Sequence, residues 1–223
     1  MIVADASTSS HLSTLAQIIV ADHGLIPCGS AGLAAAMAEI MKDKTRRVVT
    51  APLKWGGPFL AVVGSKSQMS RRQVNRVKQL AWVSMVEASP SALTEQQRER
   101  EIDRVVQQVL EMFRHSKAVL LYLQEDATES NLDPRMIASG LGEITLRILQ
   151  GCHLQGLLLT GGDITASVCN RLDGGAFEIL SELEPGITLG KFTAAKTFEL
   201  AVITKAGSFG DEVTLVRLLE SIV

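Results

Sequence analysis

The sequence predicts an α/β protein with a mostly parallel sheet, helices on both faces and ligand loops at the carboxyl-terminal edge of the strands. Three short apolar runs at residues 59–63, 157–160 and 200–204 carry this prediction. Such runs, bounded by turn residues, are typical of buried parallel strands. Each run ends in a loop of small residues that opens into a helical pattern. Because these loops share one edge of the sheet, they indicate a nucleotide-binding crevice there.

The first fifty residues differ in pattern from the rest. A short strand is expected at residues 1–6, followed by helices at 9–21, where apolar residues recur at helical spacing, and at the Ala-rich segment 31–41. Residues 45–58 are polar or carry Gly and Pro, and they form the best candidate for a domain boundary. We therefore divide the chain into residues 1–50 and 51–223.

Strands and helices alternate from residue 59 onward, which is typical of a parallel α/β sheet. The patterns Ser70-x-x-Gln73 and Thr94-x-x-Gln97 resemble capping boxes, and Asp133-Pro134 suits a helix start. Strands are expected at residues 59–63, 82–86, 118–123, 156–160, 177–183, 187–192 and 198–204, and helices at 70–80, 94–113, 133–149, 164–172 and 212–222.

Composition excludes several classes of function. The net charge of -2 and the pI near 6.1 argue against a nucleic-acid binder. The three cysteines form no Cys-x-x-Cys pair and the four histidines are scattered, so we expect no metal held by side chains alone. No apolar run approaches the ~20 residues of a membrane span, and no signal peptide is evident. We therefore expect a cytoplasmic protein with no membrane partner.

The loop sequences leave alternatives open. No Walker or Rossmann glycine pattern is present. Residues 64–67 suit a phosphate or ribose contact, or an ordinary strand-to-helix turn. In the next loop Asp163 could cap a helix, contact a ribose or bind Mg²⁺ through water. In the last loop Lys205 could neutralise phosphate, or be a surface lysine beside a Gly-rich turn.

In order and spacing, four motifs resemble the C-terminal nucleotide-binding domain of the four-carbon acid sugar kinase family. The resemblance runs from about residue 59 to the C-terminus, and it is fairly specific because the four motifs occur together. The first ~45 residues resemble the tail of that family's substrate-binding domain, so residues 1–50 are interpreted as this trailing segment. The motifs are Gly64-Ser65-Lys66-Ser67-x-x-Ser70-x-x-Gln73, Thr160-Gly161-Gly162-Asp163, Glu182-x-x-Pro185-Gly186 and Lys205-Ala206-Gly207-Ser208-Phe209-Gly210-Asp211.

The resemblance implies ATP as phosphate donor, Mg²⁺ carried with it, and threonate or erythronate as the class of acceptor. By this resemblance the ATP contacts are Ser65, the stretch Gly161-Gly162-Asp163 and Gly207. To these we add Ile164, through its backbone N–H, and Lys205. The chain departs from the family pattern at Ile164, where Thr is common, at Ser70, where Thr is usual, and at Ser208, which replaces a common Gly.

The resemblance also implies what this chain does not contain. The family's N-terminal acid-sugar domain is absent, so we expect an ATP-binding portion that is inactive as a phosphotransferase until that domain completes it. The chain is then an expressed fragment, a truncated gene product or half of a split enzyme. The alternative is a non-catalytic nucleotide-binding or assembly protein derived from that fold. For either function, self-association into a homo-oligomer is among the expected partners. No residue spacing nominates a catalytic base or an acid–base pair.

Overall fold

The computed structural model describes residues 1–42, 56–125, 132–172, 175–194 and 198–222 of the chain. Two compact units make up the chain, Met1–Val48 and Val49–Val223, and each is described by itself. The division predicted after residue 50, with its assignment of the two parts, stays a prediction. Most of the predicted boundary segment, from residue 43 to residue 55, lies outside the described residues.

The first unit contains two helices that pack against each other, α1 (Ser9–Ala21) and α2 (Ala31–Met41). The Thr8 hydroxyl caps α1 by accepting a hydrogen bond from the His11 backbone N–H. The strand predicted at residues 1–6 is wrong: these residues form no strand and are exposed. A strand needs a partner for its backbone groups, and the described part of this unit offers none.

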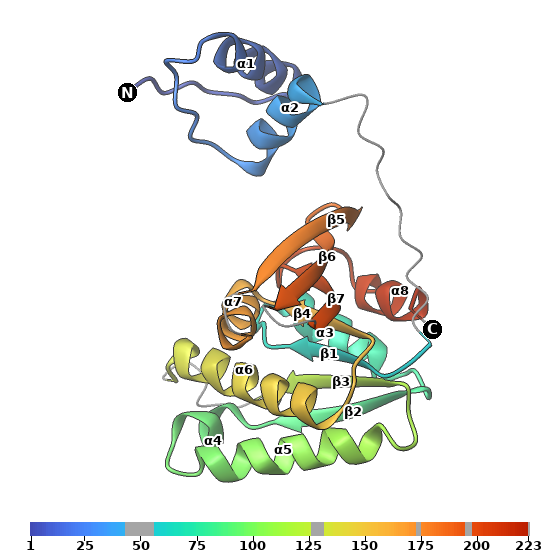
Figure 1. Cartoon of the computed structure of the whole chain (residues 1–223). Coiled ribbons are helices and arrows are strands. Elements are labelled where there is room, and N and C mark those ends of the chain that lie inside the picture. Colours follow the sequence, from blue (N-terminus) through green and yellow to red (C-terminus); the bar gives the residue numbers. More distant parts are fainter. Residues whose placement is uncertain (43–55, 126–131, 173–174, 195–197, 223) are drawn as a thin grey trace. The chain divides into compact units, whose positions relative to one another are not determined.

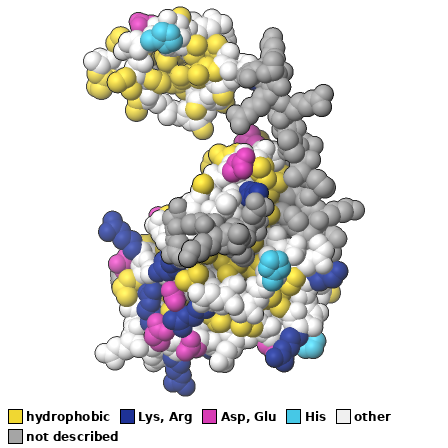
Figure 2. All heavy atoms as spheres, in the orientation of Figure 1, with side chains coloured by type: hydrophobic (Ala, Val, Ile, Leu, Met, Phe, Trp, Pro, Cys, Tyr) yellow, Lys and Arg dark blue, Asp and Glu magenta, His cyan; other side chains and the backbone are white. Residues whose placement is uncertain are grey.

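The first unit buries little of its own apolar surface. Among its described residues, only Ala16 and Leu33 are buried hydrophobics. Figure 2 shows hydrophobic side chains over much of the visible face of this unit. Exposed apolar patches of this kind typically mark surfaces that pack against another partner. The exposed large hydrophobic residues of the unit are Met1, Ile2, Val3, Ile18, Ile26, Ile40 and Met41.

The second unit is built on a seven-stranded sheet in the order β2-β3-β1-β4-β7-β6-β5 (Figure 1). The first five strands in this order pair in parallel, and β5 and β6 extend the sheet as an antiparallel edge. The predicted mostly parallel sheet is therefore confirmed. The strands are β1 (Phe59–Val63), β2 (Val83–Ala88), β3 (Ala118–Leu123), β4 (Gly156–Thr160), β5 (Ala176–Glu184), β6 (Ile187–Ala194) and β7 (Phe198–Lys205).

Helices cover both faces of this sheet, as predicted. The central strand β1 is buried throughout, and its side chains alternate between two hydrophobic cores. Leu60 and Val62 join the core beneath α4 (Pro90–Thr94), α5 (Arg98–Met112), α6 (Pro134–Gly151) and α7 (Gly162–Arg171). Phe59, Ala61 and Val63 join the core beneath α3 (Gln68–Val77) and α8 (Thr214–Glu220). Among the described residues, no helix has the length and apolar character to cross a bilayer.

Two predicted capping boxes do not form. Helix α3 begins before Ser70, because the Ser67 hydroxyl caps it by accepting from the Ser70 backbone N–H at 3.1 Å. The single helix predicted at residues 94–113 is two helices, since Ser89 caps the short α4 and Pro90 occupies its first turn. Thr94 ends α4 and donates its hydroxyl to the Ser91 carbonyl, so it cannot open the next helix.

Candidate functional site

The three predicted loops meet because β1, β4 and β7 are neighbours in the sheet. Val63, Thr160 and Lys205 stand at the same level on the three strands. Backbone hydrogen bonds join the loops that follow, from the Gly64 N–H to the Thr160 carbonyl at 3.3 Å and from the Gly161 N–H to the Lys205 carbonyl at 2.9 Å. Segments about 140 residues apart therefore form one continuous surface at the carboxyl edge.

A cavity of about 410 Å³ lies between these loops and the start of α6; we call it the loop cavity. Every predicted ATP contact except Lys205 lines it. The apolar part of the lining, which comes from Pro134, Ile137 and Ala138 of α6, was not predicted. Its position follows from the topology, because α6 comes after β3 and therefore begins at the same edge of the sheet. The lining residues are Gly64, Ser65, Lys66, Ser67, Pro134, Ile137, Ala138, Gly161, Gly162, Asp163, Ile164, Gly207 and Ser208.

The amino end of α7 presents backbone N–H groups to this cavity. Gly161 has φ +111°, which side-chain-bearing residues rarely adopt, and the first hydrogen bond of the helix runs from the Thr165 N–H to the Gly161 carbonyl. The N–H groups of the three residues between them precede that bond and carry the positive end of the helix dipole. A Cβ on Gly162 would meet nothing within 4 Å, so an anion has open access here.

Asp163 and Ile164 take different positions in this first turn. Asp163 is exposed and makes no capping bond, so of the three alternatives for this residue the structure does not support helix capping. Ile164 is 3% exposed and packs under the first loop, where a Cβ on Gly64 would lie 2.4 Å from its Cδ1. The neighbouring Thr165 hydroxyl donates to the Gly161 carbonyl at 3.0 Å. Because the Ile164 side chain is apolar and buried, this residue can offer a ligand in the loop cavity only its backbone N–H.

Three side chains from the start of α3 hold the loop after β7; we call Ser67, Ser70 and Gln73 the α3 clamp. The Ser67 and Ser70 hydroxyls donate to the Gly207 carbonyl at 2.7 and 2.8 Å. The Gln73 amide donates to the carbonyls of Phe209, at 3.2 Å, and Asp211, at 2.7 Å. The Ser70-x-x-Gln73 pattern thus makes a tertiary contact instead of a capping box. The sequence could have indicated this contact, because a spacing of three places both side chains on one face of the helix.

Gly207 lies against the first loop more closely than any side chain would allow. A Cβ at this position would stand 1.8 Å from the Ser65 Oγ and 2.5 Å from the Ser65 Cβ. The same Ser65 hydroxyl oxygen accepts a hydrogen bond from the Ser67 N–H at 3.2 Å. Glycine is therefore required for the two loops to close on each other.

Lys205 lies inside its own loop. It is 2% exposed, and its ammonium donates to the carbonyls of Ala206, at 3.0 Å, Phe209, at 3.1 Å, and Gly207, at 3.4 Å. The interpretation as a surface lysine is therefore wrong. The ammonium organises the carbonyls behind the cavity and does not line the cavity itself. Burial lowers the pKa of Lys205 to about 8, from an ordinary value of 10.5.

This pKa predicts a pH dependence of stability. Between about pH 8 and 10.5 the unfolded chain binds the proton on Lys205 more fully than the folded chain does, so the contribution of this group to stability rises with pH across that window. We expect the difference in unfolding free energy between the wild type and Lys205→Met to shift in favour of the wild type from pH 8 to 10.5. Urea denaturation of both proteins measures it, and a difference independent of pH would contradict the lowered pKa.

Acidic and metal-binding side chains are sparse at the site. The described ranges hold no group of three or more His, Cys, Asp or Glu side chains placed to hold a metal ion. Asp163 is the acidic residue of the cavity lining. The polar groups of the loop cavity are thus mainly backbone N–H groups and hydroxyls, which suit an anionic ligand.

The comparisons with known proteins agree with this geometry. Residues 60–215 match the family model described as the nucleotide-binding C-terminal domain. A D-threonate kinase of Salmonella typhimurium is 29% identical over 231 residues, which cover 96% of this chain and 52% of that protein. A D-erythronate kinase of Heliobacterium modesticaldum is 27% identical over 230 residues, covering 95% and 51%.

A solved structure also shares the fold. It is a domain of unknown function from Bordetella bronchiseptica, a domain-swapped dimer with bound citrate, and it aligns with a TM-score of 0.65 at 27% identity. The alignment covers 97% of this chain and 52% of that one. The chain thus spans about half the length of the curated relatives it matches. It belongs to the four-carbon acid sugar kinase family, and the part that it carries includes that family's nucleotide-binding C-terminal domain.

Proposed function

We propose that this chain binds ATP as the phosphate-donor half of a kinase that phosphorylates a four-carbon acid sugar of the threonate and erythronate class. The convergence of three sequence-distant loops on one cavity carries the proposal, since these loops bring most of the predicted ATP contacts together. A cavity of about 410 Å³ falls in the size range of small-ligand sites. The names of the relatives supply the class of acceptor.

The lining suggests how a nucleotide lies in this cavity. The phosphates meet the N–H groups at the start of α7 and the hydroxyl of Ser65, while the buried Lys205 adds positive charge from behind. The apolar residues Pro134, Ile137 and Ala138 offer a surface for the base. Asp163, the carboxylate in the cavity lining, would hold a Mg²⁺ ion carried by the nucleotide, through water. When bound, the ion would neutralise charge on the phosphates.

The acid-sugar domain, in the half of the relatives that this sequence does not span, is proposed to complete the acceptor side of the reaction. Phosphoryl transfer depends on holding donor and acceptor in line, so we expect little turnover from the donor half by itself. A cytoplasmic location is part of the proposal, because ATP is the donor. Self-association is also part of it, supported by the domain-swapped dimer of the Bordetella relative.

Calorimetric titration of the chain with ADP and ATP, with and without Mg²⁺, tests the proposal. We expect micromolar to low-millimolar Kd values, corresponding to about -8 to -4 kcal/mol. Gly161→Val, which forces a side chain onto a φ of +111°, is expected to abolish the heat of binding. The absence of both binding heat and thermal shift would refute the proposal. Binding without turnover, even when a complementary acid-sugar domain is added, would favour the non-catalytic alternative.

A further inference from the structure

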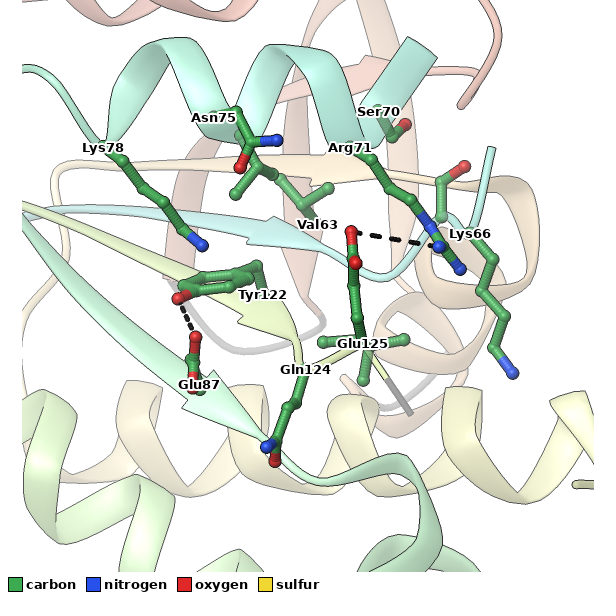
Figure 3. A pocket seen from close by; sticks show the side chains of 13 residues that line it. Val63, Lys66, Ser70, Arg71, Asn75, Lys78, Glu87, Tyr122, Gln124 and Glu125 are labelled. Carbon is green, nitrogen blue, oxygen red and sulfur yellow. Dashed lines mark hydrogen bonds and ion pairs between the residues drawn. The ribbon is translucent and has the colours of Figure 1, made fainter. Parts of the chain in front are cut away.

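A second cavity of about 330 Å³ lies on the other side of the first loop, between α3 and the carboxyl ends of β1, β2 and β3 (Figure 3); we call it the α3 cavity. It shares Ser65 and Lys66 with the loop cavity. The residues that line it are Val63, Ser65, Lys66, Ser70, Arg71, Val74, Asn75, Lys78, Glu87, Tyr122, Leu123, Gln124 and Glu125.

The sheet topology explains why a crevice opens here. The adjacent strands β1 and β3 are followed by helices on opposite faces of the sheet, since α3 packs on one core and α6 on the other. The chain therefore leaves the two strands in opposite directions, which is the arrangement that creates a ligand crevice in open α/β sheets. The loop cavity occupies the neighbouring crevice, so the two cavities stand side by side along one edge.

The charge of the α3 cavity favours an anion. Lys66, Arg71 and Lys78 line it against two carboxylates, Glu87 and Glu125, so its formal charge is positive although the whole chain carries -2. Figure 3 shows Lys78 reaching from α3 toward the ring of Tyr122, and its ammonium lies 4.7 Å from the ring centroid. A cation held over an aromatic face beside a cavity is well placed to meet a negative group.

Both carboxylates of the α3 cavity already have partners. The Tyr122 hydroxyl donates a hydrogen bond to the Glu87 carboxylate, and Arg71 lies 3.8 Å from the Glu125 carboxylate. Their remaining lone pairs can accept hydrogen bonds from a ligand. The negative charges of Glu87 and Glu125 repel a compact dianion such as phosphate more strongly than they repel a ligand carboxylate, because the carboxylate carries a smaller charge.

The neutral groups of the cavity add selectivity for hydroxyls. The amides of Asn75 and Gln124 both donate and accept hydrogen bonds, and the carboxylates accept them. The apolar contribution is small and comes from Val63, Val74 and Leu123. A small ligand with one carboxylate and several hydroxyls matches this mixture of cations, amides and acceptors.

We propose that the α3 cavity binds a small hydroxylated carboxylate next to the nucleotide. The proposal deepens the proposed function and rests on it for the identity of the acid, which we take to be of the threonate class. The evidence for the site itself is independent of that function and consists of the charged and polar residues that line the α3 cavity. In this arrangement the nucleotide-binding unit contributes contacts to the acceptor as well as to the donor, on the two sides of the loop at residues 64–67.

NMR titration of the isotope-labelled full chain tests where the acid binds. D-Threonate is added alone and after saturation with ADP, and inorganic phosphate is titrated in parallel. We expect threonate to shift the backbone signals of residues 75–78 and 122–125, and ADP to shift those of 161–164 and 207. Threonate shifts confined to the ADP loops, no saturable shift at all, or tighter binding of phosphate than of threonate would each overturn the proposal.

Lys78 provides the matched variants, because it is exposed and its replacement leaves the core untouched. Lys78→Gln is expected to weaken threonate binding at least tenfold, while Lys78→Arg stays within threefold of the wild type. Lys117→Gln makes the same charge change on an exposed lysine at the amino end of β3, and it should alter nothing. Unchanged threonate affinity in Lys78→Gln would overturn the proposal. ADP binding measured on the same proteins reports separately on the proposed function.

Discussion

The Gly162→Val protein is expected to lose nucleotide affinity by at least a hundredfold and to keep the stability of the wild type. A Cβ at this position meets nothing within 4 Å in the protein, so the fold tolerates it. The same space lies in front of the N–H groups of α7, where the phosphates are proposed to bind. Calorimetry with ADP, together with urea denaturation, separates the two effects.

Two further glycines serve as controls for this experiment. Gly56→Val also adds a side chain where nothing lies within 4 Å, and it should leave both binding and stability unchanged. Gly207→Val should abolish binding and also destabilise the protein, because its Cβ would stand 2.5 Å from the Ser65 Cβ. If Gly162→Val binds ADP as tightly as the wild type, the phosphates do not approach the start of α7.

The second large effect is expected from Lys205→Met, which should destabilise the protein by about 2–4 kcal/mol. Methionine keeps an unbranched apolar side chain one atom shorter than lysine but leaves the carbonyls of Ala206, Gly207 and Phe209 without the ammonium donor. Hydrogen bonds to a charged group contribute more than neutral ones. The Gly207 and Phe209 carbonyls keep their bonds from the α3 clamp, whereas the Ala206 carbonyl loses its side-chain donor. We also expect ADP binding to fall, since the loop after β7 forms one wall of the cavity.

Urea denaturation at pH 7 measures the first effect and ADP titration the second. Lys117→Met removes an exposed ammonium at the opposite edge of the sheet, and its stability should stay within 0.5 kcal/mol or so of the wild type, about the range of surface substitutions. A Lys205→Met protein as stable as this control would show that the three carbonyls do not depend on the ammonium.

Much of the fold could be predicted because the parallel strands are marked locally. A strand buried on both faces, such as β1 or β4, is a short apolar run between turn residues, and this signal requires no knowledge of its neighbours. Residues 1–6 gave a similar local signal and still form no strand, because strand formation depends on a partner that the described part of the first unit does not supply.

The candidate site could be predicted where glycines indicate that two backbone segments come close together. It could be predicted less well where side chains from distant elements contact each other. Gly161 and Gly207 lie in Gly-rich loops that the sequence displays directly. The burial of Lys205 follows from the loop folding back over it, which no local pattern reports. The α3 cavity was not predicted at all, since residues such as Lys78 and Tyr122 come from separate elements and meet only once the strand order is known.

Strand β7, which follows β4 in the sequence by about forty residues, lies inside the sheet, between β4 and β6. Until it is translated, β4 has an open edge on that side, and the fully apolar stretch Leu157-Leu158-Leu159 has no neighbour there. Open apolar edges of this kind recruit other strands, and long-range parallel pairing is slow to form. The nascent chain is therefore expected to be vulnerable to aggregation, and unable to bind a nucleotide, until β7 has been synthesised.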